Sequence, residues 1–134
     1  MESTIVSLIN RPKILRLGGL ERGKLNQFLK IKTKYIKKPK DVVVPGSNKV
    51  HYSPGIPIRL NVKKPRQSEA FILIKKKKLS GKNFYYLSKT KNLKEVAKNL
   101  YKTIRMIKNK KFKKIAVEKI PNYGFGQAIN DRLH

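Results

Sequence analysis

The sequence predicts an α/β fold in which strands and helices alternate in one layered body. Residues 70–74, Ala-Phe-Ile-Leu-Ile, form a continuous apolar run, which is typical of a central strand covered on both faces. Residues 93–107 carry apolar side chains at three- and four-residue spacing, which predicts an amphipathic helix. Together with shorter strand-like and helix-like segments, these give the succession β, β, β, α, β, α from residue 56 onward.

The first 33 residues predict a small β-β-α unit. Residues 4–9 are rich in β-branched side chains, and residues 13–16 follow them after a turn signal, so we expect two short strands. Gly18-Gly19 ends the second strand, and residues 21–29 have the spacing of a short helix. Because so small a unit cannot bury a core by itself, we interpret it as the last piece of something larger.

Residues 34–55 are predicted to form an extended linker, rich in lysine and proline. In the body that follows, residues 56–62 alternate apolar and polar side chains as in a half-buried strand. Asn92 is the predicted N-cap of the long helix. The remaining expected elements are strands over 84–87 and 112–117, a loop over 121–126 and a helix over 127–133.

The charge is strongly basic: 34 Lys and Arg stand against 7 Asp and Glu, for a net charge of +27. A field of this size attracts polyanions and predicts weak, salt-sensitive binding of tRNA or other nucleic acid. The alternative is compositional drift, because 27 of the basic residues are lysines, whereas specific phosphate readout favours arginine. No membrane segment or secretory signal is visible, so we expect a cytoplasmic protein.

Few residues qualify for a functional site. The chain has no cysteine, and its acids and two histidines form no visible catalytic or metal-binding cluster. Arg16 precedes Gly18-Gly19 at a strand end, where it could hold a phosphate bidentately, with an ordinary surface arginine as the alternative. The stretch 44–54 lies outside any helix or strand pattern and contains His51 beside Tyr52, so it is a candidate binding segment.

Two further motifs have simpler interpretations. Gly124-Phe-Gly126 before a helix could present backbone N–H groups to an anion, but a glycine loop that permits a tight turn explains it better. The run Lys75–Lys78 could contact phosphates, but a solvated hairpin end is the favoured interpretation.

Taken together, the segments resemble the threonylcarbamoyl-AMP synthase family in its long form, which has a YrdC-like catalytic domain, a linker and a C-terminal domain. Glu2–Val6 is similar to the family's G-L-E-S-T strand, and Pro12–Gly18 to P-x-I-L-R-P-G. Pro45–Pro54 is similar to the linker motif P-G-M-K-Y-x-H-Y-(A/S)-P. Asn92–Ile104 matches a helix beginning D-L-x-E-A-A-x-N-L, and Pro121–Leu133 matches P-x-x-G-(L/I/F)-G-x-A-I-N-D-R-L.

The resemblance implies three parts: residues 1–33 as the end of the YrdC-like domain, 34–55 as the linker, and 56–134 as a Rossmann-like, three-layer α/β/α domain with a mixed sheet. It implies synthesis of threonylcarbamoyl-AMP from threonine, bicarbonate and ATP, with magnesium in the substrate complex and no tightly bound cofactor. Ser3 and Arg16 would line the nucleotide pocket. His51 and Tyr52 would face the substrate from the linker, which acts as a lid that excludes water.

The resemblance starts within the G-L-E-S-T strand, so these 134 residues do not include most of the YrdC-like domain. We therefore expect no synthase activity from the chain alone, because a lid without a pocket cannot position three substrates. A separately encoded YrdC-like half could complete the site. The alternatives are a basic RNA-binding module and a truncated gene product without activity.

Overall fold

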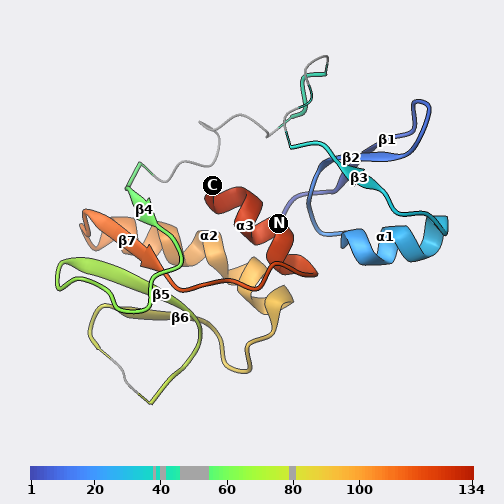
Figure 1. The fold of residues 1–134 in the computed structure, drawn as a ribbon. Coiled ribbons are helices and arrows are strands. Elements are labelled where there is room, and N and C mark those ends of the chain that lie inside the picture. The colour runs from blue at the N-terminus through green and yellow to red at the C-terminus, as the bar shows by residue number, and fades with distance from the viewer. Residues whose placement is uncertain (38, 40–41, 46–54, 79–80) are drawn as a thin grey trace.

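The computed structural model describes residues 1–37, 39, 42–45, 55–78 and 81–134, which fold around two sheets (Figure 1). We call residues 1–37 the head and residues 55–134 the body. The α/β class predicted from the sequence is confirmed.

The head contains a three-stranded sheet and one helix. Strand β1 (Ile5–Ser7) pairs antiparallel with β2 (Lys13–Arg16), and β2 pairs in parallel with β3 (Lys34–Tyr35). Helix α1 (Arg22–Leu29) connects β2 to β3. The β-β-α succession agrees with the prediction, whereas β3 falls where the sequence indicated the start of the linker.

The body contains a sheet in the order β4-β7-β5-β6. Its strands are β4 (Ile58–Arg59), β5 (Glu69–Lys75), β6 (Phe84–Ser88) and β7 (Lys114–Val117), and all the pairings are parallel. The resemblance implied a mixed sheet, whereas the strands paired in this sheet all run in the same direction. Parallel pairing follows from the crossovers, since α2 (Leu93–Asn109) carries the chain from β6 back to β7.

Helices α2 and α3 (Phe125–Leu133) pack on the same face of this sheet. Alternate residues of β5 divide between the two faces: Ala70, Ile72 and Ile74 join the cluster with the helices. Phe71 and Leu73 join a smaller cluster on the opposite face with Val62, from the connection between β4 and β5. Within the described residues, this second face is therefore covered by an irregular segment rather than by the helical third layer that the resemblance implied.

The predicted capping of α2 is confirmed. The side chain of Asn92 accepts hydrogen bonds from the backbone N–H groups of Lys94, at 2.9 Å, and Glu95, at 3.3 Å. The Glu95 carboxylate accepts from the Ser88 hydroxyl, whose oxygen in turn accepts from the Asn92 N–H. The end of β6 and the start of α2 are thus fixed together by one polar network.

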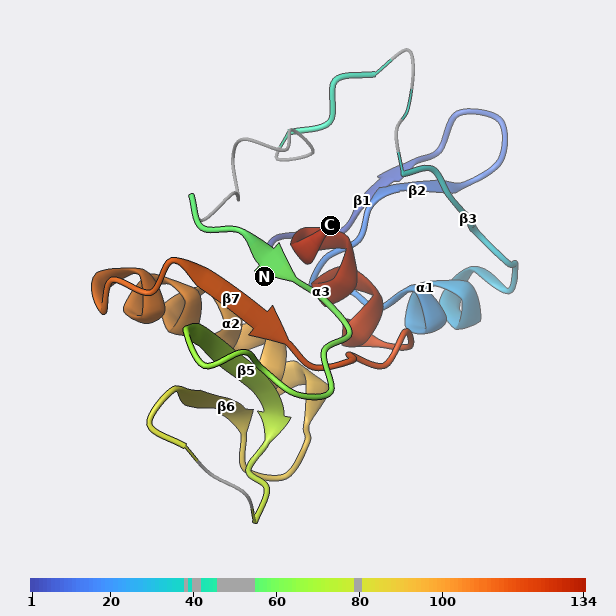
Figure 2. The ribbon, with the colours of Figure 1, turned by 60° about the vertical axis from the view of Figure 1, so that its left-hand side comes forward.

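Helix α3 joins the head to the body, and both views show it between them (Figures 1 and 2). Its Ile129 is buried in the main body cluster, and its Ala128 is buried with Ile14, Leu17 and Leu25 of the head. The helix begins at residue 125, two residues earlier than predicted. The predicted glycine turn is present: a side chain at position 126 would meet the Pro121 carbonyl oxygen at 1.9 Å.

Candidate functional site

Arg16 is the predicted site residue with the best-defined surroundings. It is the last residue of β2. Its Nε and Nη2 groups donate to the backbone carbonyl of Ser3, at 3.1 and 2.9 Å, and its Nη1 donates to the carbonyl of Pro45 at 2.5 Å. Arg16 therefore brings together the start of β1, the end of β2 and the linker.

The backbone around Ser3 is held by a close approach to the glycine turn after β2. A Cβ at Gly18 would lie 2.3 Å from the Glu2 carbonyl oxygen and 2.6 Å from the Thr4 nitrogen, so only glycine fits there. The Gly19 N–H donates to the Glu2 carbonyl at 2.7 Å. These contacts place the exposed Ser3 beside Arg16, and their shared place in a nucleotide pocket, which the resemblance implied, stays a prediction.

The guanidinium of Arg16 keeps donor capacity. An arginine side chain has five N–H donors. The three bonds to the carbonyls of Ser3 and Pro45 use three of them. Within the described residues the other two donors make no further bond, which is compatible with the predicted contact to a phosphate.

The linker is described only in part. Val44 is buried, with 3% of its surface exposed, directly before Pro45. His51 and Tyr52 lie outside the described residues, so their predicted place over the site stays a prediction.

A second polar cluster, which the sequence did not reveal, joins the head to α3. The Tyr35 hydroxyl donates to the Asp131 carboxylate at 2.5 Å. Arg132 donates through Nε to the Glu2 carboxylate at 3.1 Å and through Nη2 to the Leu17 carbonyl at 3.3 Å. Burial, reinforced by the bond to Asp131, raises the pKa of Tyr35, so this phenol remains a protonated donor at neutral pH.

These contacts border a cavity of about 420 Å³ between head and body. Head residues Arg22 and Lys37 line it, together with Asn130 and His134 of the α3 region. Four carboxamides, at Asn61, Asn122, Gln127 and Asn130, contribute both donors and acceptors. The cavity is therefore lined mainly by hydrogen-bonding groups, with the cations Arg22, Lys37 and Lys119 among them.

The described residues contain no group of three or more His, Cys, Asp or Glu that could hold a metal ion. Among the described carboxylic acids, Glu69 has a strongly shifted pKa, and its role is structural. The Arg59 guanidinium and the Arg66 backbone N–H lower the pKa of Glu69 to about 2. Arg59 and Glu69 connect β4 to the start of β5, on a part of the body remote in sequence from Arg16.

Of the other two motifs, the Lys75–Lys78 run is exposed as expected but forms no hairpin end, because β5 and β6 on either side of it are parallel. The glycine motif forms the tight turn that the simpler interpretation expected. Lys77 of the Lys75–Lys78 run forms an ion pair with Glu118. Gly124 has a positive φ of 52° and precedes the first residue of α3, as a tight turn requires. None of the described helices is long and apolar enough to cross a membrane.

The chain thus consists of an α/β body and a β-β-α head that meet at α3, and Arg16 holds Pro45 of the linker. A family model described as threonylcarbamoyl-AMP synthase, C-terminal domain, matches residues 15–134. The chain belongs to this family. A search of curated proteins found no match.

Two solved structures share the fold. The crystal structure of P. abyssi Sua5 complexed with L-threonine has a TM-score of 0.79 and 23% sequence identity, over 98% of this chain and 44% of that one. A P. abyssi Sua5 variant, with a histidine and the following tyrosine both replaced by alanine, has a TM-score of 0.73 and 22% identity, over 98% and 43%. The chain thus spans less than half the length of either protein.

Proposed function

We propose that this chain supplies the lid and the C-terminal domain of an L-threonylcarbamoyladenylate synthase. The reaction would join threonine, bicarbonate and ATP into threonylcarbamoyl-AMP and release pyrophosphate, for threonylcarbamoyladenosine formation in tRNA in the cytoplasm. The observation that carries the proposal is the family match over residues 15–134. We further propose that the chain is inactive alone, because the relatives that share its fold are more than twice as long.

In this proposal Arg16 has two roles. It fixes the middle of the linker through the Pro45 carbonyl, and its other two donors bind a phosphate of ATP, which enters as a magnesium complex. Ser3 lies against the same guanidinium and would line the nucleotide pocket. The linker would then close over the pocket and limit hydrolysis of the acyl adenylate.

His51 and Tyr52 are proposed to face the substrate from that linker. The support comes from a likeness of residue types: the second P. abyssi structure carries alanine at an adjacent histidine and tyrosine, and His51-Tyr52 is the sole such pair in this sequence. Replacement of His51 and Tyr52 by alanine in the reconstituted synthase should lower its rate and tests this assignment.

Exposed apolar side chains in the head and the linker support a partner. Among the described residues, nine large apolar side chains are classed as exposed, and seven of them lie between positions 8 and 43. They are Leu8, Ile9, Leu20, Phe28, Ile31, Val42 and Val43. Apolar groups this concentrated indicate a surface that is covered in the working protein. We propose a separately encoded YrdC-like half as the covering partner.

The test is threonine- and bicarbonate-dependent pyrophosphate release from ATP. We expect no release by the chain alone and release when a YrdC-like domain is added. In that mixture Arg16→Lys should lower the rate at least tenfold, because lysine cannot contact two carbonyls and a phosphate with one planar group. Arg105→Lys, on the exposed side of α2, is the matched control. Full activity of the Arg16→Lys mixture would exclude the proposed phosphate contact.

A further inference from the structure

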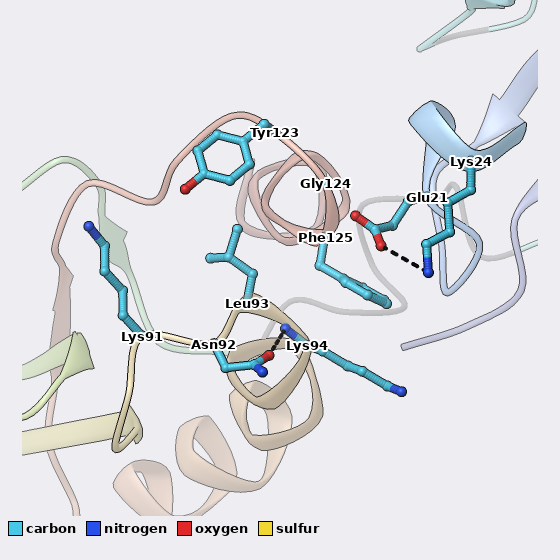
Figure 3. A pocket seen from close by; sticks show the side chains of 9 residues that line it. All are labelled: Glu21, Lys24, Lys91, Asn92, Leu93, Lys94, Tyr123, Gly124 and Phe125. Atoms are coloured by element: carbon cyan, nitrogen blue, oxygen red, sulfur yellow. Dashed lines mark hydrogen bonds and ion pairs between the residues drawn. The ribbon is translucent and has the colours of Figure 1, made fainter. Parts of the chain in front are cut away.

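A basic cleft lies at the meeting point of α1, α2 and α3, with a volume of about 400 Å³. Figure 3 shows the side chains that line it. We define the basic cleft by these residues: Glu21, Lys24, Lys91, Asn92, Leu93, Lys94, Tyr123, Gly124 and Phe125. The basic cleft shares no lining residue with the cavity between head and body described above.

The charge of the basic cleft is positive. Lys24, Lys91 and Lys94 all have exposed side chains, and Glu21 is the single acid among the lining residues. The Glu21 carboxylate lies 3.7 Å from the Lys24 ammonium, so this acid offsets Lys24 in part. Lys91 and Lys94 are the lysines best placed to attract an anion.

The basic cleft also presents an aromatic ring. Tyr123 is 65% exposed, in a body where Met106 is the other large apolar side chain classed as exposed among the described residues. In Figure 3 the Tyr123 ring and Lys91 lie on one side of Leu93, and Phe125, Lys94 and Lys24 lie on the other. An exposed ring with one cation beside it and others farther along the same cleft is an arrangement that can bind a stacked base and backbone phosphates together.

We propose that the basic cleft binds single-stranded nucleic acid. Lys91 and Lys94 contact two backbone phosphates, and the Tyr123 ring stacks on one base. An acidic protein segment would use the lysines but would leave the ring without a matching partner, which is why a nucleic acid is favoured. The proposal is independent of the synthase function, since none of these residues contacts Arg16 or the linker in the described structure.

The test is fluorescence anisotropy with the whole chain and labelled, unstructured oligonucleotides of about ten residues. Ribo- and deoxyribo-oligonucleotides form two arms that identify the kind of strand. Lys91→Ala/Lys94→Ala should weaken binding about tenfold and reduce the slope of log K against log salt by about 1.4, which is 0.7 for each phosphate lost. The control Lys98→Ala/Lys102→Ala removes equal charge from exposed positions of the same helix and should change affinity less than about twofold.

The ring is tested separately from the charge. Tyr123→Ala should weaken oligonucleotide binding at least about fivefold, whereas Tyr123→Phe keeps the stacking face and should retain the affinity. Inorganic polyphosphate has no bases, so its affinity should not respond to Tyr123→Ala. Glu21→Gln should strengthen binding about twofold by removing a negative charge from the cleft.

Three results would overturn the proposal. Equal losses in the two double-lysine variants would mean that bulk charge alone binds the strand. An unchanged affinity in Tyr123→Ala would remove the base contact. A polyglutamate peptide that binds as tightly as the oligonucleotides and depends on Lys91 and Lys94 would assign the cleft to an acidic protein segment. Thermal melting of each variant confirms that the fold is retained.

Discussion

Replacement of Arg132 by methionine is expected to loosen the head from the body. The Arg132 side chain is 4% exposed and holds the Glu2 carboxylate and the Leu17 carbonyl of the head. Methionine keeps much of the apolar stem and the helix propensity of the position but donates no hydrogen bond. The substitution therefore removes the polar contacts of Arg132 with the head, together with its ion pair to the neighbouring Asp131.

The magnitude follows from the burial of the two partners. Removal of one member of a fully buried ion pair costs about 3–5 kcal/mol, and a carbonyl left without its donor costs about 1–3 kcal/mol. The Glu2 side chain is 25% exposed, so water recovers part of the loss. We expect a decrease of about 2–4 kcal/mol in the free energy of unfolding. For a chain of this length, that loss of stability lowers Tm by about 6–12 °C.

Circular dichroism melting and urea unfolding measure this loss. The control Arg105→Met, at an exposed position of α2, should stay within about 0.5 kcal/mol of the wild type. A double-mutant cycle with Glu2→Gln should show a coupling energy of at least about 1 kcal/mol. If Arg132→Met melts with the control, or if the cycle shows no coupling, the contacts do not hold the head to the body.

Three further substitutions test local features. Gly18→Ala should cost about 1–3 kcal/mol in a urea titration, because its Cβ would lie 2.3 Å from the Glu2 carbonyl, while Gly23→Ala has open space and should not destabilise. Asn92→Ala should cost about 1 kcal/mol by the same measurement, through loss of the α2 N-cap, and Asn92→Asp should retain the cap. Glu69 has a pKa lowered from 4.5 to about 2, so its pair with Arg59 stabilises the fold above pH 4.5 and is lost as the pH falls through 2. The stability difference between wild type and Glu69→Gln should therefore shrink in acid, and a difference that is constant with pH would contradict this assignment.

The elements that could be predicted from the sequence are those with a strong local pattern. The apolar run at 70–74 lies within β5, and the three- and four-residue spacing after Asn92 forms α2 with the expected cap. The alternation at 56–62 predicted too long a strand. Only Ile58–Arg59 pairs with β7 as a strand, because Asn61, with a φ of 57°, interrupts the extended backbone before the Val62 N–H donates to the Val117 carbonyl. The two-residue strand β3 depends on β2 beside it, and lysines surround it in sequence.

The candidate site likewise has a part that the sequence predicted and a part that it did not. Arg16 was predicted from the glycines that follow it, and Gly18 is indeed required where the backbone of residues 2–4 crosses. The atoms it contacts are backbone carbonyls, which carry no sequence signal. The pairing of Arg132 with Glu2 joins residues 130 positions apart and follows from the tertiary fold alone. The sequence gives only a weak indication that Tyr123 is functional, because it is an aromatic residue in a loop that contains proline and glycine.

The central proposal is that this chain completes a threonylcarbamoyl-AMP synthase and does not act alone. Its most direct measurement is the transfer of label from bicarbonate into threonylcarbamoyl-AMP, in the presence of threonine and ATP. The chain alone and a YrdC-like domain lacking its C-terminal partner are each compared with the mixture of the two. We expect the product to form faster in the mixture than in the sum of the separate reactions. Synthesis by the chain alone, or a mixture no faster than that sum, would contradict the account.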